Sequence, residues 1–310
     1  MLDIFKDIPD SMHWRKVELV NKGWSSDIKY HIVTNENRQL LLRISNISSY
    51  DRKKEEFETM KMLDSCSILM SRPIDFGMCN NKQSVFTLLT WIEGSDAEVV
   101  LPVLTPKEQY NLGYNAGKVL AKLHKIPVPV FRENWAERFN KKIDIKIKNY
   151  KACPIKIDKA DKIIDYINEN RFLLENRIQT FQHGDFHVGN MVVTVKNEVG
   201  IIDFNRYDFG DPWEEFNRIV WCAGISTHFS SGRINGYFEG EVPEAFFRLM
   251  ALYIGNNTLS SLPWAIPFGD AEVKTMLNQA QNVLAWYDDF SSYIPRWYIP
   301  HKVAKEKIFS

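Results

Sequence analysis

The sequence predicts an α+β fold of two parts, a small antiparallel-sheet lobe followed by a larger and mostly helical lobe. Three observations predict it. Short β-rich runs fill much of the first ninety residues around one amphipathic helix. The pattern breaks at Gly94, and from Thr105 onward helical spacing prevails to the end of the chain. With 310 residues, 45% of them hydrophobic, the chain is long enough to bury two cores of this kind.

The antiparallel sheet of the first lobe is predicted from runs of β-forming residues separated by turn-forming residues. Strands are expected over residues 17–20, 28–34, 39–44 and 84–89. The turn-prone residues 35–37 join the second and third of these strands into an antiparallel hairpin. Residues 50–64 change to helical spacing, because Phe57, Met60 and Leu63 recur among charged side chains.

The second lobe opens on a strong helix-start signal. Thr105 can cap the helix, Pro106 suits its first position, and Glu108 can reach back to the cap. A second helical region is expected over residues 136–175, whose basic excess we interpret as a solvated face rather than a phosphate site. We therefore divide the chain into residues 1–91 and 95–310, with a hinge at about 90–94.

Composition narrows the function classes. The 39 basic and 39 acidic residues cancel, which argues against a nucleic-acid partner, and no apolar run approaches the length of a membrane span. The start of the chain has neither a signal-peptide nor a transit-peptide pattern. Cys66, Cys79, Cys153 and Cys222 are widely spaced and fit packed thiols in a reducing compartment, so we expect a cytoplasmic protein.

Three oxygen-bearing side chains form the strongest candidate site. Asp185 and Asn190 lie in the run FQHGDFHVGN, and Asp203 follows Asn190 after thirteen residues, at the end of an apolar run. Oxygen ligands of this kind suit Mg²⁺, which prefers one or two carboxylates together with waters and substrate phosphates. We assign Asn190 and Asp203 to the metal. Asp185 is then left to face an acceptor hydroxyl.

The run HGDFHVGN resembles the catalytic loop of the aminoglycoside phosphotransferase family. The resemblance implies that Asp185 is the catalytic Asp, that His183 supports the loop, and that Asn190 and Asp203 bind Mg²⁺. It also implies that Asp211, in GDPWEEF, braces the loop. Further similar stretches are KGWSSDIKY, LLLRIS, TWIEG and LAKLHKIP. The family's protein-kinase-like bilobal fold and its use of ATP or GTP as co-substrate are implied for this chain.

The first lobe would then bind the nucleotide. The loop at residues 22–27 offers Ser25 and Ser26 as phosphate contacts, although on the loop alone a plain hairpin turn is as good an interpretation. Arg43 and Glu56 would form the cation–carboxylate pair of kinases, with Glu55 as the reserve partner. By the resemblance, the carbonyl of Thr90 and the N–H of Ile92 read the base.

Two departures from the family pattern bear on activity. Arg43 stands where most kinases have Lys, so the phosphate clamp is either adapted to a guanidinium or impaired. Glu215 stands where the family pattern has a further Asp, which leaves its role open between a brace and a substrate contact.

The acceptor is expected to be a small molecule. Asp211, which starts the next helix, is only the eighth residue after Asp203, so there is no room for a peptide-binding activation segment and no protein substrate is expected. Candidate acceptor contacts are Asp208, Glu214 and Glu215.

The charge of the acceptor is inferred from composition. From residue 204 to the end, 12 acidic residues outnumber 9 basic ones, which suits a cationic acceptor or equally a solvated acidic face. With the resemblance, this points to phosphoryl transfer to an aminoglycoside and to antibiotic resistance. The alternatives are a metabolite kinase of choline or methylthioribose type, and a pseudokinase that binds nucleotide without turnover.

Overall fold

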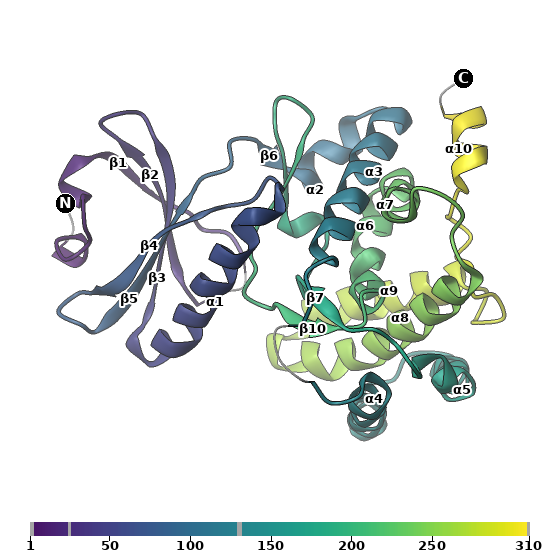
Figure 1. Ribbon diagram of the computed structural model, residues 1–310. Helices are drawn as coiled ribbons and strands as arrows, with labels where there is room; N and C mark the ends of the chain where they lie inside the picture. The colour runs from purple at the N-terminus through teal and green to yellow at the C-terminus, as the bar shows by residue number, and fades with distance from the viewer. Residues whose placement is uncertain (1–2, 24–25, 129–131, 309–310) are drawn as a thin grey trace. The chain divides into compact units, whose positions relative to one another are not determined.

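The computed structural model describes residues 3–23, 26–128 and 132–308. The chain forms two compact units (Figure 1). The sheet unit comprises Met1–Ser95 and Met191–Asn205, and the helical unit comprises Asp96–Asn190 and Arg206–Ser310. The division of the chain near residues 91–95 stays a prediction. It assigned residues 191–205 to the second lobe, whereas in the structure they group with the N-terminal segment.

The sheet unit is built on a five-stranded antiparallel sheet in the order β1-β2-β3-β5-β4. Its elements are β1 (Trp14–Leu19), β2 (Ile28–Thr34), β3 (Gln39–Asn46), α1 (Tyr50–Leu63), β4 (Pro73–Cys79) and β5 (Ser84–Thr90). The four expected strands and the helix are confirmed. Strand β4 was not predicted, because Pro73, Asp75 and Gly77 are poor strand formers that pairing with β5 holds in place.

The two faces of this sheet are covered by different segments. Phe5 and Ile8, from the N-terminal turns, join Leu42 and Leu88 in the core on one face. On the other face α1 packs against β4 through Phe57, which stacks on Phe76 with ring centroids 5.5 Å apart. Because side chains alternate along a strand, the neighbours of Leu42 in β3 point toward α1.

A short hairpin completes the sheet unit. It pairs β8 (Met191–Val193) with β9 (Val199–Ile201), and Ile201 donates its N–H to the carbonyl of Leu69 at 2.9 Å. Gly94 passes so close to this hairpin that a Cβ would lie 2.4 Å from the carbonyl oxygen of Val193. A larger residue at this position would therefore displace the backbone.

The helical unit contains most of the helices and one two-stranded sheet. Its helices are α2 (Ala97–Val100), α3 (Pro106–Leu123), α4 (Trp135–Ala152), α5 (Ala160–Asn170), α6 (Ile219–Ile225), α7 (Thr227–Phe238), α8 (Glu244–Ala265), α9 (Asp270–Trp286) and α10 (His301–Lys307). Strand β7 (Thr180–Gln182) pairs with β10 (Asp208–Gly210), while β6 (Ser95–Asp96) lies at the boundary between the units. Both bonds of the expected capping box, between Thr105 and Glu108, are present.

Helices α3 and α7 pack unusually closely. A Cβ on Gly113 would lie 2.0 Å from the carbonyl oxygen of Phe229, and one on Gly236 would lie 2.0 Å from that of Tyr114. Gly117 and Gly232 are equally confined by the facing backbone. These small residues let the two backbones touch, which fixes α7 and the side chains that it carries.

The expected helix start at Asp211 needs a correction. The carboxylate of Asp211 accepts the N–H of Trp213 at 3.0 Å and thereby closes a turn. A 3-10 helix, Glu214–Arg218, follows, and the α-helix begins only at Ile219. The shift arises because a side chain that binds the N–H two residues ahead stabilises a turn in place of the first α-helical turn.

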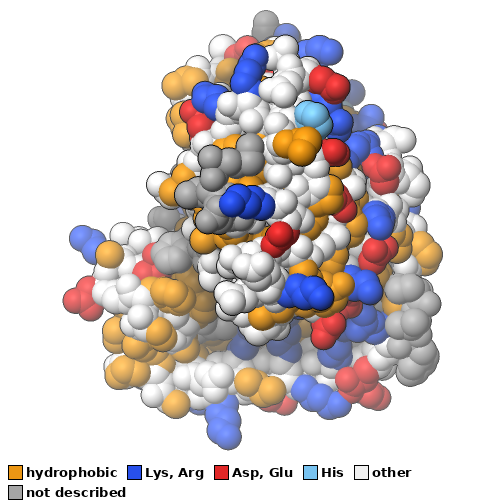
Figure 2. All heavy atoms as spheres, turned by 90° about the vertical axis from the view of Figure 1, so that its left-hand side faces the viewer, with side chains coloured by type: hydrophobic (Ala, Val, Ile, Leu, Met, Phe, Trp, Pro, Cys, Tyr) orange, Lys and Arg blue, Asp and Glu red, His pale blue; other side chains and the backbone are white. Residues whose placement is uncertain are grey.

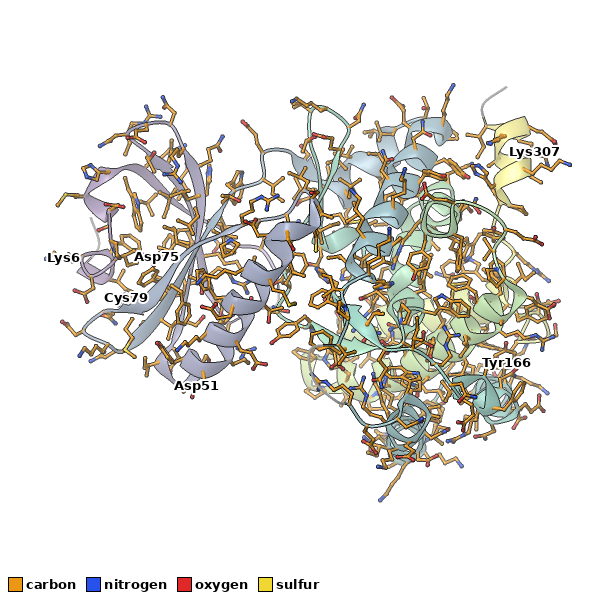
Figure 3. The ribbon with its side chains drawn as sticks, in the orientation of Figure 1. Lys6, Asp51, Asp75, Cys79, Tyr166 and Lys307 are labelled. Carbon is orange, nitrogen blue, oxygen red and sulfur yellow. The ribbon has the colours of Figure 1, made fainter. Side chains whose placement is uncertain are left out.

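The remaining general expectations concern surface charge and cysteines. Acidic and basic side chains are interspersed on the face drawn in Figure 2. No helix in the described part of the chain combines the length and apolar character of a membrane span. The four cysteines are unpaired, and three of them are buried, including Cys79 in the sheet unit (Figure 3).

Candidate active site

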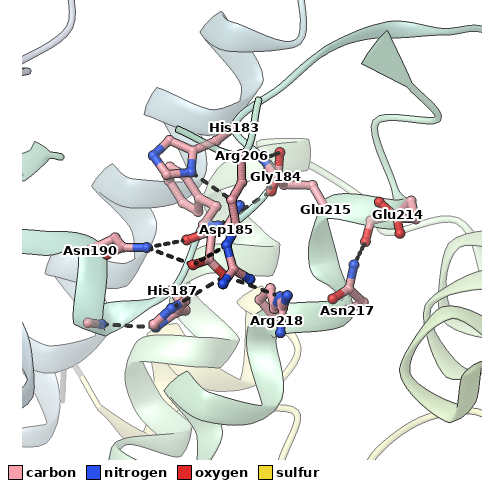
Figure 4. Close-up of polar contacts among 12 residues, drawn as sticks. His183, Gly184, Asp185, His187, Asn190, Arg206, Glu214, Glu215, Asn217 and Arg218 are labelled. Atoms are coloured by element: carbon pink, nitrogen blue, oxygen red, sulfur yellow. Dashed lines mark hydrogen bonds and ion pairs between the residues drawn. The ribbon is translucent and has the colours of Figure 1, made fainter. Parts of the chain in front are cut away.

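The predicted catalytic loop, residues 183–190, lies in the helical unit and is held around Asp185. The Nδ2 of Asn190 donates to the carbonyl oxygen of Asp185 at 2.9 Å and to its Oδ2 at 3.2 Å (Figure 4). Gly184 allows the loop to turn, because its φ is +80° and a Cβ would lie 1.9 Å from the carbonyl oxygen of Arg206. The loop thus presents a carboxylate in one fixed orientation.

Glu215 braces the backbone of this loop. It is 1% exposed, and its carboxylate accepts the N–H of Gly184 at 3.0 Å and that of Phe186 at 3.4 Å. The buried ring of His183 accepts the N–H of Asp185 at 3.2 Å, which agrees with a supporting role. Of the two roles that the sequence left open for Glu215, the burial favours the brace, and a group so enclosed is not placed to contact an acceptor.

Arg233 supports the loop from α7 and was not singled out from the sequence. Its guanidinium is fully buried and donates to the carbonyl oxygen of Phe186 at 2.8 Å. It also lies over the rings of Phe186 and Phe216, at 4.7 and 4.8 Å from their centroids. The sequence did contain a signal for this role, because Arg233 is a charged residue in a Gly-rich, largely apolar helix.

Asp211 is buried but serves the segment before the loop. Its carboxylate accepts hydrogen bonds from Arg177 at 2.7 and 3.0 Å and from the hydroxyl of Tyr253 at 2.6 Å. Its carbonyl oxygen accepts from Gln182, the residue that precedes His183, at 2.7 Å. The bracing role predicted for Asp211 therefore concerns the approach to the loop, whereas the direct contacts come from Glu215.

Three basic side chains surround the carboxylate of Asp185. The Nε of Arg218 lies 3.2 Å from Oδ1, the Nε2 of His187 lies 3.6 Å from Oδ1, and the Nε of Arg206 lies 3.9 Å from Oδ2 (Figure 4). Burial alone would raise the pKa of Asp185, but the hydrogen bond from His187 and the nearby charges outweigh it and lower the pKa. Asp185 is therefore ionised at neutral pH.

In the sheet unit, Arg43 lies at the centre of a buried ionic cluster. Its side chain is 6% exposed, its Nη2 lies 2.8 Å from Oδ2 of Asp27, and its Nε donates to the same oxygen at 3.0 Å. Its Nη1 donates to Oδ1 of Asp203 at 3.0 Å and lies 3.5 Å from Glu56. The predicted pair of Arg43 and Glu56 is thus a loose contact within a larger network.

Three members of this cluster, Asp27, Lys53 and Ser45, were not singled out from the sequence. Lys53 donates to Asp27 at 2.7 Å and to Glu56 at 3.2 Å, and Ser45 donates to the other oxygen of Asp27 at 2.7 Å. Burial alone would raise the pKa of Asp27, but Arg43 and Lys53 lower it. Lys53 lies one helical turn before Glu56, a spacing that could have drawn attention to it.

The chemistry of the predicted metal ligands fits Mg²⁺. Asn190 offers an amide oxygen, because its Nδ2 is already used by Asp185, and Asp203 offers a partly exposed carboxylate. No cluster of three acidic, His or Cys side chains suited to a metal occurs among the described residues. Asn190 belongs to the helical unit and Asp203 to the sheet unit, so their joint role stays a prediction.

The other predicted nucleotide contacts are in the sheet unit. Ser25 lies outside the described residues, and Ser26 is exposed. Thr90 ends β5, where its hydroxyl accepts the N–H of Arg72 at 2.8 Å. Ile92 is buried against Gly200. The base-reading roles of Thr90 and Ile92 stay predictions.

The remaining predicted acceptor contacts, Asp208 and Glu214, have partners of their own. Asp208 is exposed in β10 and pairs with Arg138 at 3.7 Å. Glu214 lies 3.2 Å from Lys142 and accepts from Gln182 at 3.2 Å. Both carboxylates are therefore already matched by a basic or amide side chain.

Comparison with known proteins identifies the family. Residues 16–247 match the family described as "Phosphotransferase enzyme family". The chain belongs to this phosphotransferase family. No curated protein sequence matches it.

Solved structures of phosphotransferases share the fold. The ADP-bound aminoglycoside phosphotransferase APH(2'')-Ib has a TM-score of 0.64 and 19% identity, over 90% of this chain and 98% of that chain. The GDP complex of wild-type aminoglycoside 2'-phosphotransferase-IIIa has a TM-score of 0.68 and 16% identity, over 91% and 96%. The streptomycin–ATP ternary complex of APH(2")-IIa has a TM-score of 0.62 and 19% identity, over 91% and 97%. At these identities the likeness establishes the kinase-like fold, which confirms the predicted fold class.

Proposed function

We propose that this phosphotransferase moves the γ-phosphoryl group of ATP or GTP to a hydroxyl of a small polar molecule. The observation that carries the proposal is the fixed, ionised carboxylate of Asp185, which Asn190, His183 and Glu215 hold through the loop backbone and side chain. A carboxylate so placed can orient a hydroxyl and accept its proton as the phosphoryl group is transferred. Membership of the family and the nucleotide-bound structures of similar fold support this reaction.

The sheet unit supplies the nucleotide contacts in this proposal. Arg43 holds phosphate oxygens by its planar guanidinium, which Asp27 and Glu56 orient. Ser25 and Ser26 offer backbone or hydroxyl contacts to the phosphates, and Thr90 and Ile92 read the base. Mg²⁺, when bound by Asn190 and Asp203, neutralises charge on the phosphates.

The acceptor was predicted to be an aminoglycoside, and similar folds have been solved with streptomycin and kanamycin bound. Those complexes support an aminoglycoside acceptor here only through a distant likeness. The side chains around Asp185 favour a different class of acceptor. A metabolite kinase is compatible with the same chemistry.

The test is phosphoryl transfer by the full-length protein with Mg²⁺ and either ATP or GTP. We expect nucleoside diphosphate release that depends on an added hydroxyl compound, with the phosphorylated acceptor identified by its mass. The panel should include aminoglycosides, choline, methylthioribose, sugars and hydroxy acids. Tight nucleotide binding without acceptor-dependent turnover across the panel would instead support the binding-only pseudokinase.

A further inference from the structure

The charge around Asp185 is the reverse of what a cationic acceptor needs. Arg218, Arg206 and His187 all lie within 4 Å of its carboxylate. Two of these are permanently charged, so they outnumber the single carboxylate that they contact. A polyamine approaching Asp185 would meet repulsion from both guanidinium groups.

The guanidinium of Arg218 has unused hydrogen-bond donors. Its Nε faces Asp185 as an ion pair but is buried without a hydrogen bond, and the guanidinium donates no hydrogen bond to any described residue. The side chain is still 24% exposed, so a ligand can reach it. A guanidinium with free donors matches a carboxylate or phosphate in geometry and charge.

The acidic side chains that were predicted to meet a cationic acceptor are buried or lie near a basic partner. Glu215 is buried under the loop, Glu214 pairs with Lys142, and Asp208 pairs with Arg138. What stays available beside the catalytic carboxylate is therefore basic.

We propose that the acceptor carries an anionic group, a carboxylate or a phosphate, which Arg218 and Arg206 bind while its hydroxyl faces Asp185. The inference rests on the proposed phosphotransfer, because it assumes that the acceptor hydroxyl meets Asp185. It predicts that the preferred substrates are hydroxyl compounds bearing one such anion. It departs from the cationic acceptor expected from composition.

The test uses four compounds that share one scaffold and differ in charge. Gluconate carries a carboxylate, glucose 6-phosphate a phosphate, glucose no charge, and glucosamine a cation. Binding to the full-length protein with Mg²⁺ and a non-hydrolysable ATP analogue is measured by calorimetry, and turnover is measured with ATP. We expect one of the anionic compounds to bind at least about tenfold more tightly than glucose and glucosamine, and the comparison between the two anions identifies the group.

Substitutions test whether the preference for an anion depends on Arg218. Arg218→Gln should raise the KM or Kd of the preferred anion at least about tenfold and change that of the nucleotide much less. Arg248→Gln is the matched control, since Arg248 is an arginine of the same unit that pairs with Glu244.

The outcomes separate this inference from the proposed function. Equal binding of all four compounds, preference for glucosamine or kanamycin, or the absence of any binding would overturn the anionic acceptor. A loss in Arg218→Gln that affects nucleotide and anion alike would also overturn it. Anion binding that needs Arg218, without phosphoryl transfer to any compound, would support the subsite and contradict the phosphotransferase activity.

Discussion

The guanidinium of Arg43 donates a hydrogen bond of 3.0 Å from Nη1 to Oδ1 of Asp203. This contact joins the predicted phosphate clamp to a predicted metal ligand within the sheet unit. The other side of the same guanidinium is held by Asp27. Arg43 is thus oriented by two carboxylates at once, which a single ammonium group could not reproduce with the same geometry.

Arg43→Lys should therefore lower kcat/KM, by about tenfold or more, because a point charge on a different stem cannot span Asp27 and Asp203. Steady-state kinetics with varied nucleotide measures the effect. Arg72→Lys, at an exposed pair with Asp64 in the same unit, is the control. Faster turnover in Arg43→Lys would mean that the native Arg impairs the enzyme, as the pseudokinase alternative requires.

Asp203→Ala and Asn190→Ala should both weaken binding of the Mg²⁺–nucleotide complex. Asp203 should have the larger effect, because it contributes a full negative charge to the cation. Calorimetry at varied Mg²⁺ concentration separates metal-dependent binding from binding of the bare nucleotide. If Asp203→Ala binds the Mg²⁺ complex as well as the native protein does, the metal lies elsewhere.

Glu215→Gln should destabilise the protein and slow turnover together. The amide keeps the shape of the side chain but loses the charge that accepts from Gly184 and Phe186, at a cost of roughly 1–3 kcal/mol in the free energy of unfolding. Urea unfolding measures this, with Glu239→Gln as the control because Glu239 forms a solvent-exposed ion pair with Lys118. Unchanged stability in Glu215→Gln would contradict a bracing role.

Stability should fall in acid because of the buried cluster around Asp27. Arg43 and Lys53 outweigh the effect of burial and lower the pKa of Asp27 below its unfolded value of about 4. The stability that it contributes is present above that value and is lost as the pH falls toward the pKa of the folded state. The free energy of unfolding should therefore decline below about pH 4.

Asp27→Asn isolates this contribution. It should lower the stability at pH 7 and flatten the decline in acid, because the titrating group is removed while the two cations lose their partner. Asp161→Asn, in the first turn of α5, is the matched control. An acid decline of the same slope in Asp27→Asn would show that other groups cause it.

The sequence predicted the strands with strong alternation and the helices with clear caps, since these are local properties. It did not predict β4, whose residues are held by pairing with β5, nor the turn at Asp211, where a side chain replaces the first helical bonds. Periodicity alone could not reveal the contact of α3 and α7, although Gly113 and Gly117 repeat at helical spacing.

In the candidate site, too, the local motif could be predicted from the sequence and the contacts between distant segments could not. The run at residues 183–190 could be identified because its residue types are rare at that spacing. Glu215 and Arg233 support the loop through contacts between segments distant in sequence, and Asp27 and Lys53 surround Arg43 in the same way. The local charge near Asp185 could not be read from composition, because the surplus acidic residues lie elsewhere or are paired.

The central claim concerns the carboxylate of Asp185, and single-turnover phosphoryl transfer in Asp185→Asn tests it most directly. Asp270→Asn is the matched control, as an exposed carboxylate of the same unit. The account predicts that the rate constant of transfer falls by about a hundredfold or more in Asp185→Asn, that nucleotide affinity measured by calorimetry changes little, and that Asp270→Asn retains transfer. Transfer at the native rate in Asp185→Asn would contradict the account.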